Sequence, residues 1–145
     1  MCMRMGNSNS VSNKLNYEDV QHAINASEKY IIINTMSPLY QSCLIPRTMP
    51  IDKEEDFINN IISKKAFDSV SVIVYGLNAN DESAYKKYQQ LKTLGILQVY
   101  IYSGGMFEWL LLQDVYGSTL FPTTTRELDI LKYKPNKILN ILFIK

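Results

Sequence analysis

Several residue types are scarce in this 145-residue sequence, and each scarcity excludes a class of protein. Two cysteines are too few for a disulfide scaffold, and a single histidine leaves no cluster for a metal site or a catalytic triad. No apolar run approaches the ~20 residues that a membrane-spanning helix needs. The polar first ten residues lack the apolar stretch of a secretory signal. We therefore expect a cytoplasmic protein that holds no metal and no other cofactor.

The chain also lacks an excess of either charge, because its 15 Lys and Arg residues nearly balance its 14 Asp and Glu residues. A nucleic-acid-binding protein would carry a basic excess, so we expect no nucleic-acid partner. The hydrophobic fraction of 46% is ordinary for a globular protein and sufficient for a core. The composition changes along the chain predict a flexible tail over residues 1–15 and a single domain over 16–145. A C-terminal extension is expected from about residue 117.

Strand-like and helix-like segments alternate along the chain. β-branched and aromatic runs predict buried strands at 30–34, 70–75 and 98–102. Helical spacing of apolar residues predicts helices that begin at Asn16, with Asp19 completing its capping box, and at Asp52, with Glu55 in the same role. Two more helices are expected, at 85–94, closed by Gly95, and at 106–116. This alternation is typical of an α/β domain with a parallel sheet.

Three segments are less regular. Residues 48–51 are expected to form a short edge strand, because Pro50 lacks the N–H that a central strand needs. Thr124 and Glu127 have the spacing of a capping box, which predicts a last helix to about residue 132. The apolar segment 138–144 is either an added strand or a docked tail.

The second half of this pattern resembles a known family. A strand at 71–75, a polar loop, a helix and a strand that ends in Gly104 and Gly105, with Trp109 shortly after, resemble the C-terminal half of a rhodanese-like domain. The resemblance extends over about residues 17–116. It implies a three-layer fold with a central, mostly parallel sheet between helices. The two glycines also predict, on their own, a sharp turn from strand to helix.

The resemblance implies where the chemistry of this sequence should be. In the family, a cysteine at the end of the central strand is the nucleophile, and the loop that follows binds an anion through its backbone N–H groups. Here Gly76 follows that strand, and residues 76–83 contain no cysteine. The loop also contains two carboxylates and no basic residue before Lys86, so we expect a degenerate, inactive site. The degenerate loop consists of Gly76, Leu77, Asn78, Ala79, Asn80, Asp81 and Glu82.

The loop residues allow two interpretations. Asn78, Asn80 and Asp81 are typical of a turn that caps the following helix. Alternatively, the loop forms a pocket for a cation or a polar ligand. The residues of this second interpretation are Gly76, Asn78, Asn80, Asp81 and Glu82.

Cys43 is the remaining candidate nucleophile. A lone cysteine among apolar residues is usually a small buried hydrophobic residue. Two functions therefore stay open from the sequence. The first is an inactive rhodanese-like module that binds or regulates a protein partner, and the second is a sulfurtransferase that uses the displaced thiol of Cys43.

Two further features bear on partners. The helix expected at 106–116 is apolar nearly all round, which indicates a core helix or, with Phe121, a surface for a partner or a second copy. Gly6 fits an N-myristoylation pattern if translation begins at Met5. Membrane association is expected only if Gly6 is acylated.

Overall fold

The computed structural model describes residues 13–139. Most of the predicted tail, including Gly6, lies outside the described residues, as does the end of the apolar segment 138–144. The prediction of a tail over 1–15 is wrong at its end, because Lys14–Leu15 form strand β1. This strand pairs in parallel with Ile101 and Tyr102, and the N–H of Ile101 donates to the carbonyl of Asn13. The chain therefore joins the sheet slightly earlier than expected.

Four parallel strands form the central sheet in the order β1-β4-β3-β2. The three longer strands agree with the prediction to within one residue. They are β2 (Tyr30–Asn34), β3 (Ser71–Tyr75) and β4 (Val99–Tyr102).

The expected edge strand at 48–51 is absent. A single bridge joins Thr48 to Ile32, and the N–H of Met49 donates to the carbonyl of Ile32 at 2.8 Å. Pro50 then has no N–H to donate, and a helix begins at Ile51. Proline therefore ends the pairing here after one bridge.

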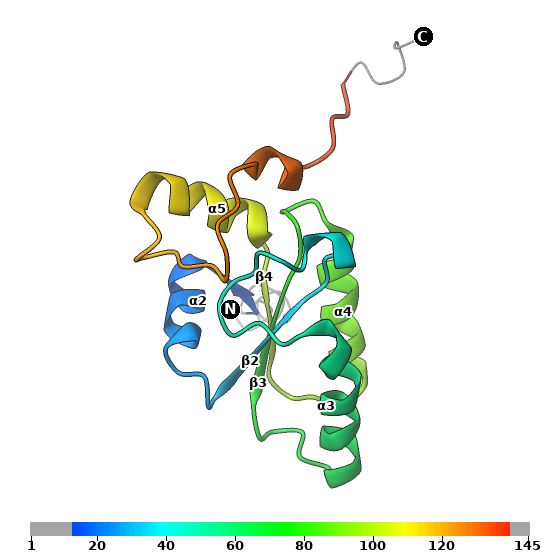
Figure 1. The fold of residues 1–145 in the computed structure, drawn as a ribbon. Coiled ribbons are helices and arrows are strands. Elements are labelled where there is room, and N and C mark those ends of the chain that lie inside the picture. The colour runs from blue at the N-terminus through cyan, green and yellow to red at the C-terminus, as the bar shows by residue number, and fades with distance from the viewer. Residues whose placement is uncertain (1–12, 140–145) are drawn as a thin grey trace, which may run out of the picture.

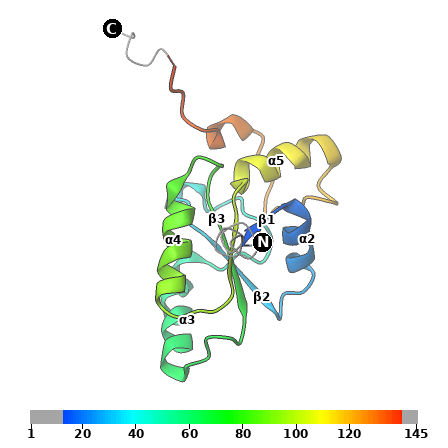
Figure 2. The same ribbon diagram turned by 180° about the vertical axis from the view of Figure 1, so that it is seen from behind.

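Helices cover both faces of the sheet, as Figures 1 and 2 show from opposite sides. Helices α3 (Ile51–Lys64) and α4 (Glu82–Thr93) lie on one face, and α2 (Tyr17–Ile24) and α5 (Gly105–Tyr116) on the other. Each face has its own core cluster. The predicted α/β fold with a parallel sheet between helices is confirmed.

The helix ends show which capping predictions hold. Asn16 and Asp19 form the expected capping box of α2. The box expected at Asp52 is wrong, because α3 begins at Ile51 after Pro50 and has no side-chain cap. Gly95 follows α4 with a φ of +108°, as expected of a glycine that closes a helix.

Residues 118–134, which we name the strap, do not contain the expected helix. Only a 3₁₀ turn, η2 (Ile130–Tyr133), is present. The N–H of Thr124 donates to the carbonyl of Leu44 at 2.8 Å, and its Oγ1 accepts from the N–H of Leu44. Because these contacts occupy the groups that would cap a helix, the segment stays extended. Glu127 instead accepts from the N–H of Asp129 and pairs with Lys132.

The strap belongs to the core on the α2 and α5 side. Phe121 and Tyr133 are 2% and 1% exposed. The indole Nε1 of the fully buried Trp109 donates to the carbonyl of Pro122 at 2.8 Å. Gln113 donates to the carbonyl of Phe121 at 2.7 Å. Removing the strap would therefore uncover large apolar side chains of α5.

Among residues 13–139, no helix has both the length and the apolar character needed to cross a bilayer.

Candidate functional site

The loop between β3 and α4 lies at the carboxyl end of the sheet, where α/β proteins place their ligand sites. Asp81 precedes α4 as its N-cap. Its Oδ1 accepts from the N–H and the hydroxyl of Ser83 at 3.0 and 2.7 Å, and its Oδ2 accepts from the N–H of Leu77 at 2.9 Å. Asn78 Oδ1 accepts from the N–H of Asn80. The prediction of a turn that caps the helix is confirmed.

The carboxyl of Asp81 has a lowered pKa. Burial alone would raise this pKa, but the hydrogen bonds from Leu77 and Ser83 stabilise the carboxylate and outweigh the burial. Asp81 therefore stays ionised at neutral pH, with its charge directed at backbone N–H groups of its own loop. These are the donors that an anionic ligand of such a loop would need.

Gly76 has a steric reason to be glycine. It is buried, and a Cβ at this position would lie 2.7 Å from Oδ2 of Asp81 and 3.0 Å from Oγ1 of Thr35. Its φ does not lie in the left-handed region, unlike those of Gly95 and Gly105. The requirement at Gly76 is therefore for space beside the Asp81 carboxylate.

Gly105 fixes the loop against the start of α5. Its φ is +71°, and a Cβ would lie 2.8 Å from both the nitrogen of Asn78 and the carbonyl oxygen of Gly76. The N–H of Met106 donates to the carbonyl of Gly76 at 2.9 Å, and the N–H of Phe107 to that of Leu77 at 2.8 Å. The expected sharp turn at Gly104 and Gly105 is confirmed, and it also supports the loop.

Gly104 and Trp109 complete this turn. A side chain on Gly104 would collide with the carboxylate of Glu108, which accepts from the hydroxyl of Tyr102 at 2.6 Å. Burial and the bond to Glu108 both raise the pKa of Tyr102. Trp109 packs edge-on against Tyr102 with ring centroids 6.2 Å apart. The contacts of Gly104 and Trp109 within residues 13–139 therefore give both residues a structural role in this turn.

A cavity of about 540 Å³ opens over the loop. The loop forms one wall, and the strap and the residues after it form the other. The lining residues are Tyr40, Leu77, Asn78, Asn80, Asp81, Glu82, Ser83, Lys132, Lys134, Asn136 and Ile138. The cavity thus brings together four of the five residues of the predicted pocket, while Gly76 lies buried beneath them.

Sequence reasoning missed the strap side of this cavity. Lys132 and Lys134 face the loop, which the sequence had indicated to be purely acidic. The amide Nδ2 of Asn78 donates to the carbonyl of Tyr133 at 2.8 Å and ties the two walls together. These partners are 55 positions apart, and no local pattern announces such a contact.

Lys132 is already engaged within the strap wall. Its Nζ lies 2.8 Å from Oε1 of Glu127 and over the rings of Tyr40 and Tyr133. The bond to Glu127 raises the pKa of Lys132, and the bond from Lys132 lowers that of Glu127. Lys134 has no ion pair in residues 13–139, so its charge is available to a ligand.

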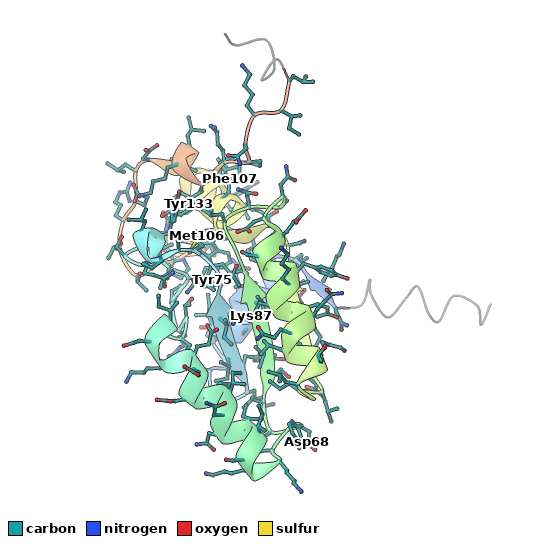
Figure 3. The ribbon with its side chains drawn as sticks, turned by 90° about the vertical axis from the view of Figure 1, so that its right-hand side faces the viewer. Asp68, Tyr75, Lys87, Met106, Phe107 and Tyr133 are labelled. Carbon is teal, nitrogen blue, oxygen red and sulfur yellow. The ribbon has the colours of Figure 1, made fainter. Side chains whose placement is uncertain are left out.

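A second cavity, of about 620 Å³, lies on the α3 side of the loop. It is lined by Thr35 and Ser83, whose hydroxyl oxygens are 2.7 Å apart, and by Lys87, which pairs with Glu54 at 2.6 Å. Figure 3 shows Lys87 between α3 and α4. The positive charge of Lys87 is therefore neutralised by Glu54, which lines the same cavity.

Cys43 lies apart from both cavities. It is 1% exposed, and its thiol donates to the carbonyl of Thr125 in the strap at 3.3 Å. This placement agrees with the interpretation of Cys43 as a buried small residue. His22 is exposed on α2, and residues 13–139 contain no cluster of side chains that could hold a metal ion.

The molecule is an α/β domain with a parallel sheet. A polar loop lies at the carboxyl end of this sheet, and the glycine turn into α5 supports the loop. The family model of the Rhodanese-like domain matches residues 14–112, so the chain belongs to the rhodanese-like family.

Solved structures share the fold at low identity. The BH2092 protein from Bacillus halodurans has a TM-score of 0.58 at 19% identity, covering 91% of this chain and 97% of that one. The Alr3790 protein from Anabaena sp. has a TM-score of 0.54 at 20% identity, covering 81% and 97%. Its rhodanese-like domain, solved by NMR, has a TM-score of 0.53 at 21% identity, covering 87% and 86%. No curated protein matches the sequence.

Proposed function

We propose that this protein is a catalytically inactive rhodanese-like module that acts by binding, as a regulatory or adaptor protein. Gly76 stands where the family resemblance puts the nucleophilic cysteine. The observation that carries the proposal is the position of the Asp81 carboxylate. It accepts from the N–H groups of Leu77 and Ser83 and lies within 2.7 Å of where a side chain on residue 76 would begin.

This carboxylate opposes both requirements of the family's chemistry. A thiolate nucleophile needs a positive local field, and a nearby carboxylate raises the pKa of a thiol. An anionic substrate needs free N–H donors in the loop, but Asp81 already occupies two of them. Two donors that an anion would need are therefore occupied without a ligand, and we take the cavity above the loop as the binding site.

The alternative is a sulfurtransferase that uses Cys43. The burial of Cys43 beneath the strap counts against it, because thiosulfate would reach the sulfur only if Thr125 moved away. A displaced nucleophile of this kind would also lack the loop donors, which lie around Asp81.

The test is catalytic turnover in two assays, thiosulfate:cyanide sulfur transfer and hydrolysis of a small aryl phosphate. We expect the wild type and Cys43→Ser to show no turnover above a blank, with an active rhodanese as the positive control. Wild-type turnover that disappears in Cys43→Ser would overturn the proposal and establish the alternative. Turnover retained in Cys43→Ser would also overturn it and point to a different group.

A gain-of-function series tests the role of Asp81 directly. Gly76→Cys alone is expected to stay inactive, because the new side chain meets the Asp81 carboxylate. Gly76→Cys with Asp81→Ser makes room, removes the charge and keeps a residue that can cap α4. We expect measurable sulfur transfer only in the double variant, with Asp81→Ser alone as the matched control. Robust turnover by Gly76→Cys alone would show that Asp81 does not block catalysis.

The location of the protein is a separate part of this proposal. We infer a cytoplasmic protein that associates with a membrane only if Gly6 is acylated. The intact mass of protein produced in its native host tests this, because a species that begins at myristoylated Gly6 would establish acylation. A chain that retains Met1 would end the idea.

A further inference from the structure

The outer side of α5 lacks the polar residues that a surface helix normally carries. Trp109 and Leu110 are buried in the core cluster on this side of the sheet. On the outer side, Phe107, Leu111 and Val115 follow one another at a spacing of four residues, and we name them the apolar stripe. Phe107 is half-buried, and Leu111 and Val115 are 43% and 70% exposed. A helix that is apolar on all sides is normally covered on all sides, so we expect the stripe to have a partner.

The chain has a second apolar element without a cover, the segment 138–144. Ile138 and Leu139 are 72% and 79% exposed, and the rest of the segment lies outside the described residues. Six of its seven residues are large and apolar. Seven residues of extended chain reach roughly 23 Å, whereas the helix rises about 12 Å from Phe107 to Val115. The segment is therefore long enough to cover the whole stripe.

The described residues lead this segment away from the stripe of their own chain. Ile138 lines the same cavity as Glu82, which begins α4 on the opposite face of the sheet from α5. Figures 1 and 2 show from opposite sides that the chain after η2 points away from the length of α5. The position of η2 is fixed, because the ring of Tyr133 lies 5.2 Å from that of Tyr40 in η1 (Pro38–Tyr40). The direction of the chain therefore favours contact with a second molecule.

The charges beside the two apolar elements are complementary. Helix α5 contains Glu108 and Asp114 and no basic residue, and the exposed Asp114 has no ion pair in the described part of the chain. Arg126 shares a cavity with Gln113, but on the strap side of the helix, where Gln113 donates to the strap. Residues 134–145 contain three lysines and no Asp or Glu. The carboxylates of α5 therefore attract this part of a second copy and disfavour an anionic lipid surface.

We propose that the chain forms a symmetric dimer in which the apolar segment 138–144 of each copy covers the apolar stripe of the other. The exchange is reciprocal, as two-fold symmetry requires. One interaction thus buries both apolar elements, and this burial drives the association. The contact is small, so we expect a chain that is monomeric at about 1 μM and dimeric at about 300 μM. The inference goes beyond the proposed function, because the dimer needs neither the inactive loop nor a ligand.

Sedimentation velocity of the full-length chain over this concentration range tests the proposal. The wild type is expected to change from monomer to dimer. The stripe variant carries Leu111→Ser and Val115→Ser, and the segment variant carries Leu142→Ser and Phe143→Ser. Each is expected to raise the dissociation constant at least about tenfold. Thermal midpoints equal to that of the wild type at about 1 μM verify that both variants are folded.

A matched control separates this interaction from general adhesion of apolar side chains. Leu39→Ser with Leu97→Ser removes two leucines that are 86% and 64% exposed and lie outside α5 and the segment. This variant should dimerise like the wild type. A loss equal to that of the stripe variant would overturn the proposal.

A mixture of the stripe variant and the segment variant tests the reciprocal exchange. Neither variant alone can form the contact, but a heterodimer of the two retains one intact segment on one intact stripe. We expect the mixture to associate more tightly than either variant alone and more weakly than the wild type. Fluorescence anisotropy of the segment variant, labelled at its amino terminus and titrated with the stripe variant, measures this.

Three results would overturn the proposal. The first is a wild type that stays monomeric at about 300 μM. The second is a dimer that persists in the segment variant, which would indicate that one stripe packs on the other. The third is a mixture of the two variants that does not associate. None of these results bears on the catalytic assays, which test the proposed function separately.

Discussion

The loop and the strap form opposite walls of one cavity, yet different contacts determine their shapes. The loop is held mainly by partners two to four positions apart, such as the bonds of Asp81 with Leu77 and Ser83. The strap is held mainly by partners in other elements, some of them about 80 positions away, as in the bond between Thr125 and Ser42. The loop therefore has a shape that its own residues specify, whereas the strap takes its shape from the rest of the fold.

This difference predicts how far a substitution in each wall disturbs the rest of the fold. Damage to the loop side chains should stay more local, because the bonds of Asp81 and Asn78 are only partly buried. Damage to the strap should spread into the core, since Phe121 and Tyr133 are buried against α5 and the sheet. The predictions below test this difference, beginning with the largest effect.

Truncation after Gly117 is expected to abolish cooperative unfolding. It removes two buried aromatic rings, each worth roughly 1.5–3 kcal/mol of burial, and uncovers Trp109 and Leu110. A whole domain has about 5–15 kcal/mol of stability, so this loss is a large fraction of it. Urea unfolding followed by Trp109 fluorescence, together with dye binding to exposed apolar surface, measures the effect.

Truncation after Lys134 is the matched control. It keeps Phe121, Tyr133 and the contact between η1 and η2, and should unfold almost like the full chain. If the chain ending at Gly117 also unfolded cooperatively with the wild-type midpoint, the strap would be an appendage rather than a part of the core.

Gly105→Ala is expected to destabilise the chain by about 2–4 kcal/mol. The alanine would be strained at a φ of +71°, and its Cβ would lie 2.8 Å from the backbone of Gly76 and Asn78. Gly117→Ala provides the control, because its φ is +98° but nothing lies within 4 Å of the added Cβ. Its ψ of 158° places Gly117 in a region that is nearly exclusive to glycine, so this alanine should cost only the backbone strain of about 1–3 kcal/mol.

The comparison of these two alanine variants by thermal unfolding isolates the contact between the loop and α5. Equal losses at both positions would mean that the backbone strain alone matters, and that α5 does not press against the loop.

The same distinction between near and distant partners explains what the sequence predicted. The strands, the Asp81 cap, Gly95 and the turn at Gly104 and Gly105 were all predicted, because each depends on neighbouring residues. The helix expected at 124–132 was wrong, because Leu44 bonds the groups of Thr124 that would have capped it. The strap side of the cavity was missed for a related reason, since Asn78 and Tyr133 meet only in the fold.

The loop at Gly76 shows a second limit of prediction from the sequence. The absence of cysteine was visible, and two carboxylates in the loop suggested simple repulsion of an anion. The structure adds that Asp81 turns inward onto the loop and that lysines face it across the cavity. A charge count along the chain contains neither the direction of a side chain nor the charge of a distant segment.

Asn78→Asp tests the side-chain bond that joins the loop to the strap within residues 13–139. The substitution keeps an oxygen for the N–H of Asn80 but replaces the donor to the carbonyl of Tyr133. A loss of about 1–3 kcal/mol is expected, because that carbonyl then faces a carboxylate. Asn80→Asp, with no side-chain partner among the described residues, is the control. If urea unfolding gave the two variants the same free energy of unfolding, the walls would not be coupled through Asn78.

The smallest expected effect concerns the charge of Asp81. Because its pKa is lowered in the folded protein, the carboxylate adds stability above the pKa of an unfolded Asp, ~3.9, and this stability is lost as the pH falls through the folded value. Asp81→Asn retains a cap of α4 but offers only one oxygen, so the N–H of Leu77 loses its acceptor. The variant should be less stable than the wild type by about 1 kcal/mol at pH 7, and the difference should shrink when the carboxylate is protonated. Urea unfolding at pH 7 and near pH 3 measures it. A difference that stays constant between these two pH values would show that the charge of Asp81 does not hold the loop.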